Sequence, residues 1–144
     1  MKAVTVSTYR KDKYFPKVVR AFARILSKFD VVAPVEVMIE MGNLTRQSHD
    51  AWRKGQVSYL ERVFLGNLSK ANRILRIIGF HAHDLNMVPS MTVYTKWGKG
   101  KRIRLRFSKS GAKRLEETYS RHYLWNQSAE KKQKMIEQAT SEPN

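Results

Sequence analysis

The chain has 144 residues, of which 28 are Lys or Arg and 12 are Asp or Glu, so its formal net charge is +16 at pH 7. The absence of cysteine excludes disulfides and thiolate metal sites and fits a reducing cytoplasm. No stretch approaches the ~18 uninterrupted apolar residues of a membrane-spanning helix, so we expect no membrane partner. Repulsion among the cations of a chain with a net charge of +16 disfavours a compact fold unless a polyanion offsets it. Nucleic acid is the usual partner of such a chain.

The first residues lack the apolar core of a secretion signal, and we expect a cytoplasmic protein. Val4 and Val6 alternate with polar residues, which favours a short strand within residues 1–9. Residues 14–30 predict a helix, because Pro16 lies near its start and apolar residues recur at helical spacing after it. Its apolar side is expected in the core, and its basic side is either solvated or within reach of phosphates.

Two short helices joined by a tight turn are predicted between Pro34 and Gly55. Pro34 suits the first turn of a helix, Gly42 supplies the left-handed position that ends it, and Thr45 is a good N-cap for the second helix. The second helix carries donors and acceptors of the kind that read base edges or bind phosphates. These are Arg46, Gln47, Ser48, His49, Asp50, Arg53 and Lys54. The alternative is an ordinary helical hairpin whose second helix is solvated.

The longest predicted helix begins with a capping box at residues 58–61 and runs to about Gly79. One side is apolar and is expected in the core. The opposite side is either solvated or in contact with a nucleic-acid backbone, and it carries Arg62, Lys70, Arg73 and Arg76. A polar loop is predicted over residues 80–89.

The predicted loop contains His81, His83 and Asp84, the densest group of potential metal ligands or catalytic side chains in the chain. Two imidazoles and a carboxylate could bind a divalent metal; the alternative is a polar loop without such a role. We expect no enzyme, no metal and no cofactor. A small basic metal-dependent nuclease is the enzymatic alternative.

Residues 91–107 predict a β-hairpin around the glycine-rich turn at 98–101. Alternation gives it an apolar face of Met91, Val93, Trp97, Ile103, Leu105 and Phe107. Its other face is predicted to carry Tyr94, Lys96, Arg102, Arg104 and Arg106. Arginines at alternate positions repel one another, and the phosphates of a duplex would relieve that repulsion. Tyr94 among these cations would suit stacking on an unpaired base.

A last helix is predicted over residues 112–125, and a polar, lysine-rich tail, partly helical or disordered, over 126–144. No linker is long enough to split the chain. We therefore expect one nucleic-acid-binding domain over residues 1–125, mainly α with a small β-hairpin and thus of the α+β class.

A helix-turn-helix followed by a basic hairpin resembles the winged helix-turn-helix DNA-binding proteins. The resemblance implies a winged-helix-like single domain whose second helix enters the major groove while the hairpin lies along the backbone or minor groove. It places Arg46, Gln47, Asp50 and Arg53 towards the bases and Lys99, Lys101, Arg102 and Arg104 on the wing. The basic faces add Lys54, Arg62, Arg73 and Arg106 to the expected DNA-binding set. The long helix between the two parts departs from the simplest winged pattern.

The expected function is double-stranded DNA binding, either sequence-specific or structure-selective, in a small regulator of transcription or of a mobile element. An RNA- or single-strand-binding subunit of a nucleoprotein complex is the alternative. Many regulators of the winged type bind as symmetric dimers, which makes a homodimer the expected form if the chain self-associates. The target sequence stays open.

Overall fold

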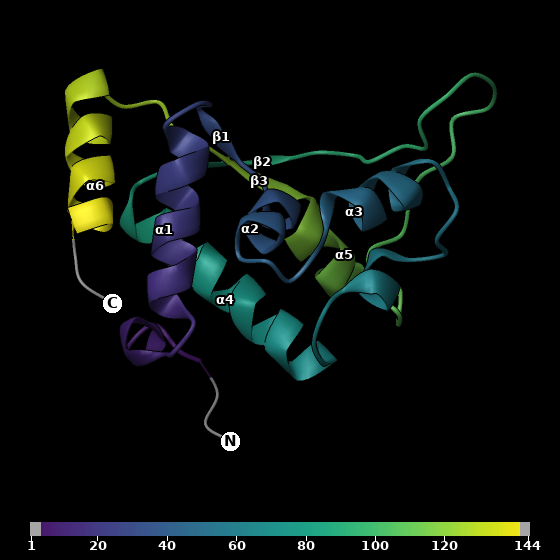
Figure 1. Cartoon of the computed structure of the whole chain (residues 1–144), viewed down its shortest axis with the longest axis horizontal. Coiled ribbons are helices and arrows are strands. Elements are labelled where there is room, and N and C mark those ends of the chain that lie inside the picture. Colours follow the sequence, from purple (N-terminus) through teal and green to yellow (C-terminus); the bar gives the residue numbers. More distant parts are fainter. Residues whose placement is uncertain (1–3, 142–144) are drawn as a thin grey trace.

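The computed structural model describes residues 4–141, in which helices predominate and one small antiparallel sheet is present, as expected of the α+β class (Figure 1). The helices are α1 (Phe15–Leu26), α2 (Pro34–Glu40), α3 (Arg46–Arg53), α4 (Leu68–Asp84), α5 (Lys113–Ser120) and α6 (Ala129–Ser141). Two 3-10 turns, η1 (Tyr9–Lys11) and η2 (Leu60–Val63), precede α1 and α4. None of the helices in this part of the chain is long and apolar enough to cross a bilayer.

The sheet has the order β1-β3-β2, with β3 (Arg121–Leu124) antiparallel to both neighbours. Strand β1 (Val31–Val32) lies between α1 and α2 in the chain, and β2 (Val88–Met91) follows α4. Helix α1 packs against α2, α4 and α6, and Figure 1 shows it between α6 and α2. The largest fully buried side chains include Phe22 of α1 and Trp52 of α3, so one core joins both halves of the molecule.

The N-terminal half of the prediction is correct for the helices and wrong for the first strand. Helices α2 and α3 form where they were expected, and α1 forms within the predicted range of 14–30 but ends at Leu26. Residues 4–9 instead turn into η1, with Thr8 N donating to Thr5 O at 3.1 Å. Val4 is buried whereas Val6 is 72% exposed. The two valines therefore do not share one face of a strand, as the alternation predicted. Residues 1–3 of that predicted strand lie outside the described residues.

The single long helix predicted from residue 58 to Gly79 is wrong, because the chain breaks there into η2, a loop and α4. Leu60 N donates to Arg106 O at 3.2 Å, and Glu61 N donates to Phe107 O at 2.9 Å. These two backbone groups therefore bond to a distant segment and not within a helix. Gly66 has φ +140°, a conformation that no helix contains. The Asn67 side chain then caps α4, which continues to Asp84 and so includes the first half of the predicted loop.

The C-terminal half also departs from expectation. The predicted helix over 112–125 ends at Ser120, and the next four residues form β3 at the centre of the sheet. The predicted hairpin strands do not form as regular strands. Residues 92–107, here called the basic arm, instead make an extended excursion with one β-bridge, Thr95 to Arg104. The tail contains α6, whose Met135 packs against the core beside α1.

Candidate nucleic-acid interface

The turn between α2 and α3 is built by local signals. Gly42 has φ +83°, and the Thr45 hydroxyl accepts a hydrogen bond from Ser48 N at 3.0 Å. Asn43 reaches out of the turn and donates from its side chain to Leu65 O at 3.0 Å. On α3, His49 and Trp52 are both buried, at 5% and 0% exposed. The two helices therefore form a fixed unit despite the polar character of α3.

The polar side chains of α3 differ in their surroundings. Arg46 donates two hydrogen bonds to Glu36 of α2, at 3.0 and 2.6 Å, and this carboxylate raises the pKa of the arginine. Asp50 lies 2.8 Å from Nδ1 of the buried His49. Gln47 and Lys54 are exposed. The outer face of α3 thus presents an amide and an ammonium directly, and a guanidinium that is shared with α2.

Arg53, predicted to face bases, lies between two aromatic rings of the basic arm. Its guanidinium carbon is 4.9 Å from the centroid of Tyr94 and 5.1 Å from that of Trp97. Its Nε is buried and has no hydrogen-bond partner among the described residues, and burial lowers its pKa. The side chain therefore connects α3 to the arm instead of projecting from the helix surface.

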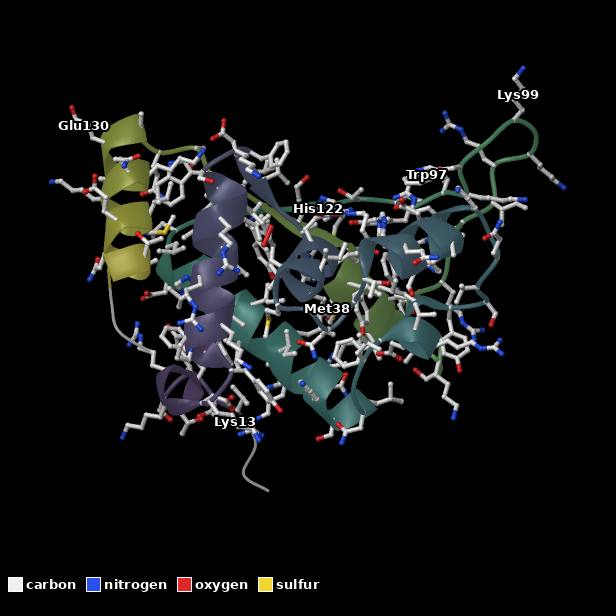
Figure 2. All side chains as sticks on the ribbon, in the orientation of Figure 1. Lys13, Met38, Trp97, Lys99, His122 and Glu130 are labelled. Carbon is white, nitrogen blue, oxygen red and sulfur yellow. The ribbon has the colours of Figure 1, made fainter. Side chains whose placement is uncertain are left out.

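The basic arm is rooted on the end of α3. Trp97 N donates to Arg53 O at 2.7 Å, and Trp52 Nε1 donates to Arg106 O at 2.9 Å. The two sides of the arm are joined by Lys96 N to Ile103 O and Leu105 N to Tyr94 O, each at 2.8 Å. Figure 1 shows the arm as a thin green excursion beyond α3, and Figure 2 places Lys99 at its tip.

The faces of the arm agree with the prediction only in part: Leu105 and Phe107 are buried and the arginines of the second half are exposed as expected, whereas other positions differ. Because Arg104 lies opposite Thr95, its side chain is on the face away from Tyr94. Tyr94 is 7% exposed and its hydroxyl lies 2.8 Å from His122 Nε2, so it cannot stack on a base as predicted. Conversely, Trp97 and Ile103, predicted to be internal, are 45% and 49% exposed.

The cations of the arm lie in a stretch of sequence that has no acidic residue. Residues 85–115 contain no Asp or Glu. They contain nine cationic residues: Lys96, Lys99, Lys101, Arg102, Arg104, Arg106, Lys109, Lys113 and Arg114. Every residue from Lys96 to Arg104 is exposed. Arg106 is also exposed and lies with its guanidinium carbon 5.3 Å from the Tyr59 ring centroid, which brings the loop before η2 to the same region.

Two carboxylates to which the sequence assigned no role in the arm fix its C-terminal end. Glu116 accepts hydrogen bonds from Phe107 N at 3.0 Å and from both Ser108 N and its hydroxyl, at 2.7 and 2.6 Å. Glu61 is 7% exposed and accepts from Lys109 N at 2.9 Å and from the Tyr119 hydroxyl at 2.8 Å. Burial, together with proximity to Glu61, raises the pKa of Tyr119. No local pattern in the sequence signals these long-range contacts.

The remaining predicted DNA-binding cations lie outside the arm. Arg62 is exposed on η2, and the contact of η2 with α3 places it in the same half of the molecule. Arg73 faces the N-terminal segment, where its Nε lies 2.5 Å from the nearly buried carboxylate of Asp12. The structure therefore brings together α3, η2 and the arm and directs Arg73 elsewhere.

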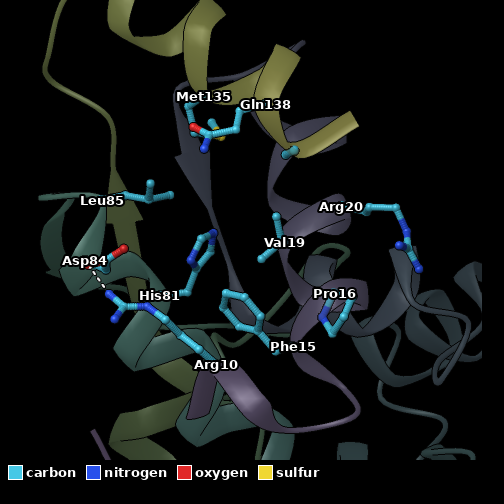
Figure 3. A pocket seen from close by; sticks show the side chains of 11 residues that line it. Arg10, Phe15, Pro16, Val19, Arg20, His81, Asp84, Leu85, Met135 and Gln138 are labelled. Carbon is cyan, nitrogen blue, oxygen red and sulfur yellow. Dashed lines mark hydrogen bonds and ion pairs between the residues drawn. The ribbon is translucent and has the colours of Figure 1, made fainter. Parts of the chain in front are cut away.

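The His81, His83 and Asp84 group lies on α4 and does not converge. No group of three potential metal-ligating side chains forms within residues 4–141. Asp84 pairs with Arg10 at 2.7 Å, as Figure 3 shows. His81 packs against Phe15 and Phe22, and burial lowers its pKa to about 4. It lines a cavity of about 400 Å³ between α1, α4 and α6, so its role is internal packing.

Known proteins offer no guide to the role of this surface. The chain matches no protein family, no curated protein and no solved structure. Its chemistry follows from the groups present: guanidinium and ammonium donors on an extended, exposed segment, within a stretch of sequence (85–115) that contains no Asp or Glu, are suited to phosphate oxygens. The arrangement offers multivalent binding of a polyanion.

Proposed function

We propose that this protein binds nucleic acid, with double-stranded DNA as its first partner, through the basic arm and the adjoining end of α3. The observation that carries the proposal is the segregation of charge. Residues 85–115 hold nine Lys or Arg and no Asp or Glu, and the arm exposes six of these cations over eleven positions. Such a segment releases counterions from a duplex when it binds, which favours association at low salt.

The way in which the arm is anchored supports a specific surface over diffuse charge. Part-buried hydrogen bonds of Trp52 and Glu116 fix both its connection to α3 and its C-terminal end. Cations on a fixed frame lose less conformational freedom on binding than cations on a free tail. The outer face of α3 and the arm then meet the duplex together, with phosphate contacts orienting the protein and exposed α3 side chains, Gln47 first, available to base edges.

A winged helix-turn-helix arrangement is part of the proposal. Three features support it. They are the glycine turn between α2 and α3, the hydrogen bond that joins the arm to the end of α3, and the sheet order β1-β3-β2 with β1 between α1 and α2. Helix α4, inserted before β2, and helix α5, inserted before β3, are departures from the simplest pattern. A role in regulating transcription or a mobile element follows from this arrangement and belongs to the same proposal.

The test is fluorescence anisotropy with labelled duplex DNA, single-stranded DNA and structured RNA, each over a series of salt concentrations. We expect the duplex to bind with a steep slope of log affinity against log salt. Replacing Lys99, Lys101, Arg102 and Arg104 by Ala should flatten the slope by up to about 3.6, since each phosphate contact on B-DNA is worth roughly 0.9.

A matched control removes four exposed cations from α1 and the α6 side of the molecule: Lys17, Lys28, Lys131 and Lys134. Both variants lose the same net charge, so a larger effect of the arm variant assigns the contact to the arm. An equal effect of the two variants would show that only overall charge matters. A clear preference of the wild type for RNA over DNA would overturn duplex DNA as the first partner.

A further inference from the structure

Trp97 is an exposed aromatic side chain placed within a run of cations. The chain has three tryptophans; Trp52 and Trp125 are 0% and 9% exposed, whereas Trp97 is 45% exposed. It lies two residues before Lys99, and Figure 2 shows Lys99 at the tip of the arm and Trp97 nearer its base. An exposed indole forgoes the stabilisation that burial would give it, so its position calls for a partner outside the chain.

The indole is held in place from the α3 side. Its own backbone N donates to Arg53 O at 2.7 Å. The Arg53 guanidinium carbon lies 5.1 Å from the ring centroid, and the His49 ring meets it edge-on at 5.9 Å and 74°. These contacts cover the indole where it faces α3. The exposed area therefore lies on the side that faces solvent, and the ring is already oriented before any ligand arrives.

We propose that Trp97 is a stacking platform for an unpaired nucleobase, so that the preferred partner is duplex DNA containing a gap or a locally melted segment. The proposal rests on the proposed function, because the arm must first bind the phosphates. Aromatic side chains beside basic residues bind single strands in this way, since each base offers a π face. In an intact duplex the faces of internal bases are covered by their neighbours, so Trp97 has no equivalent surface to contact.

The location of the indole favours a base over a lipid surface. A membrane-inserting loop would lead with its apolar side chains. Here the tip is Gly98-Lys99-Gly100-Lys101, and Trp97 lies behind it against the Arg53 guanidinium. Phosphates on either side of an unpaired nucleotide can contact Lys99 and Arg102 while the base reaches the ring.

The experiment compares three DNA duplexes of equal length: one fully paired, one with a central stretch of unpaired thymines, and one in which those thymines are abasic. The last two have the same phosphates, so they differ only in stacking. We expect wild type to bind the unpaired thymines about 5- to 150-fold more tightly than the abasic DNA, the range given by stacking of one base. Binding should also quench the fluorescence of Trp97.

Trp97→Ala should reduce that preference to near parity, and Trp97→Phe should retain part of it. The quantity compared is the ratio of the affinities for the unpaired and abasic DNA, so any change in phosphate binding, which affects both DNAs alike, cancels. Ile103→Ala is the matched control, since Ile103 is exposed to a similar extent on the same arm, at 49%, but offers no π face. It should leave the preference unchanged. Circular dichroism checks that each variant folds.

The outcomes separate the inference from the function on which it rests. Equal affinity of wild type for the unpaired and abasic DNA, with tight binding to both, would overturn the stacking platform and leave DNA binding intact. Failure to bind any of the three duplexes would overturn the proposed function itself. Quenching of Trp97 by vesicles of anionic lipid, without quenching by the unpaired thymines, would assign the indole to a membrane surface and overturn the inference.

Discussion

Single residues of the same type have different roles here because their neighbours differ. Arg46 and Arg53 lie two turns apart on α3, and both were predicted to face bases. Arg46 shares two hydrogen bonds with Glu36 across the turn, and must exchange them before it can contact a guanine. Arg53 lies between Tyr94 and Trp97, where its removal would loosen the arm. Arg53, expected from its helix position to face bases, thus packs against the arm in the free protein.

His81 makes stability depend on pH. Burial lowers its pKa to about 4, from 6.5 for a free imidazole, with Asp84 opposing and Arg10 reinforcing the shift. In the unfolded chain, the His81 imidazole therefore becomes protonated below about pH 6.5. In the folded chain it becomes protonated only at about pH 4. Unfolding is favoured as pH falls through this range, and the folded state loses about 3 kcal/mol, at about 1.4 kcal/mol per pH unit.

Urea unfolding at pH 7 and pH 4 measures this loss, and His81→Phe provides the comparison because it cannot titrate. The change in unfolding free energy between the two pH values should be smaller in the variant by up to about 3 kcal/mol. Any baseline effect of the substitution cancels, since each protein is compared with itself. An equal pH-dependent loss in both proteins would show that other groups cause it.

At the scale of elements, the sequence predicts those whose ends are marked locally. Pro34, Gly42 and Thr45 act through their own backbone or an adjacent bond, so α2 and α3 begin and end where expected. The boundaries set by distant partners were missed. Glu61 looked like part of a capping box, but its backbone N bonds to Phe107 and its carboxylate to Lys109 and Tyr119.

The same reason explains the missed strand and the reversed face of the arm. Residues 121–124 join the sheet because β1 and β2 offer edges on both sides, a tertiary condition that overrides helical periodicity. In the arm, alternation indicates which residues share a face but not which face is buried. Burial of Tyr94 against Trp52 and Phe107 settles that choice, and it exposes Trp97. The basic composition of the site was visible from sequence; its aromatic component was misassigned.

Glu116 links α5 to the arm, and its substitution tests this connection. Glu116→Gln keeps the shape but replaces one acceptor oxygen by a donor, which then faces Phe107 N, Ser108 N or the Ser108 hydroxyl. We expect the free energy of unfolding to fall by about 2–3 kcal/mol, as for a lost charged acceptor. Glu117→Gln removes the same charge from the adjacent position and should have little effect. Urea denaturation of both variants is the measurement, and equal losses would contradict the assigned role.

At the scale of the whole molecule, charge influences the fold and the proposed binding in opposite ways. A formal net charge of +16 places many cations within a small domain, and their mutual repulsion lowers stability. Added salt screens this repulsion, because the Debye length falls from about 30 Å at 0.01 M to about 10 Å at 0.1 M. The free protein should therefore become more stable as salt is raised, whereas its affinity for DNA should fall.

These opposed effects give a prediction that needs no knowledge of the target site. Thermal unfolding is recorded over a salt series with and without excess duplex DNA. At low salt the DNA should raise the midpoint by roughly 8 °C, from about 2.7 kcal/mol of linkage at 100 times the Kd. As salt increases, the midpoint of the free protein should rise and that of the complex should fall until the two meet. A difference between the two midpoints that stays constant with salt would contradict phosphate binding by the cations of the arm, because salt weakens contacts between cations and phosphates.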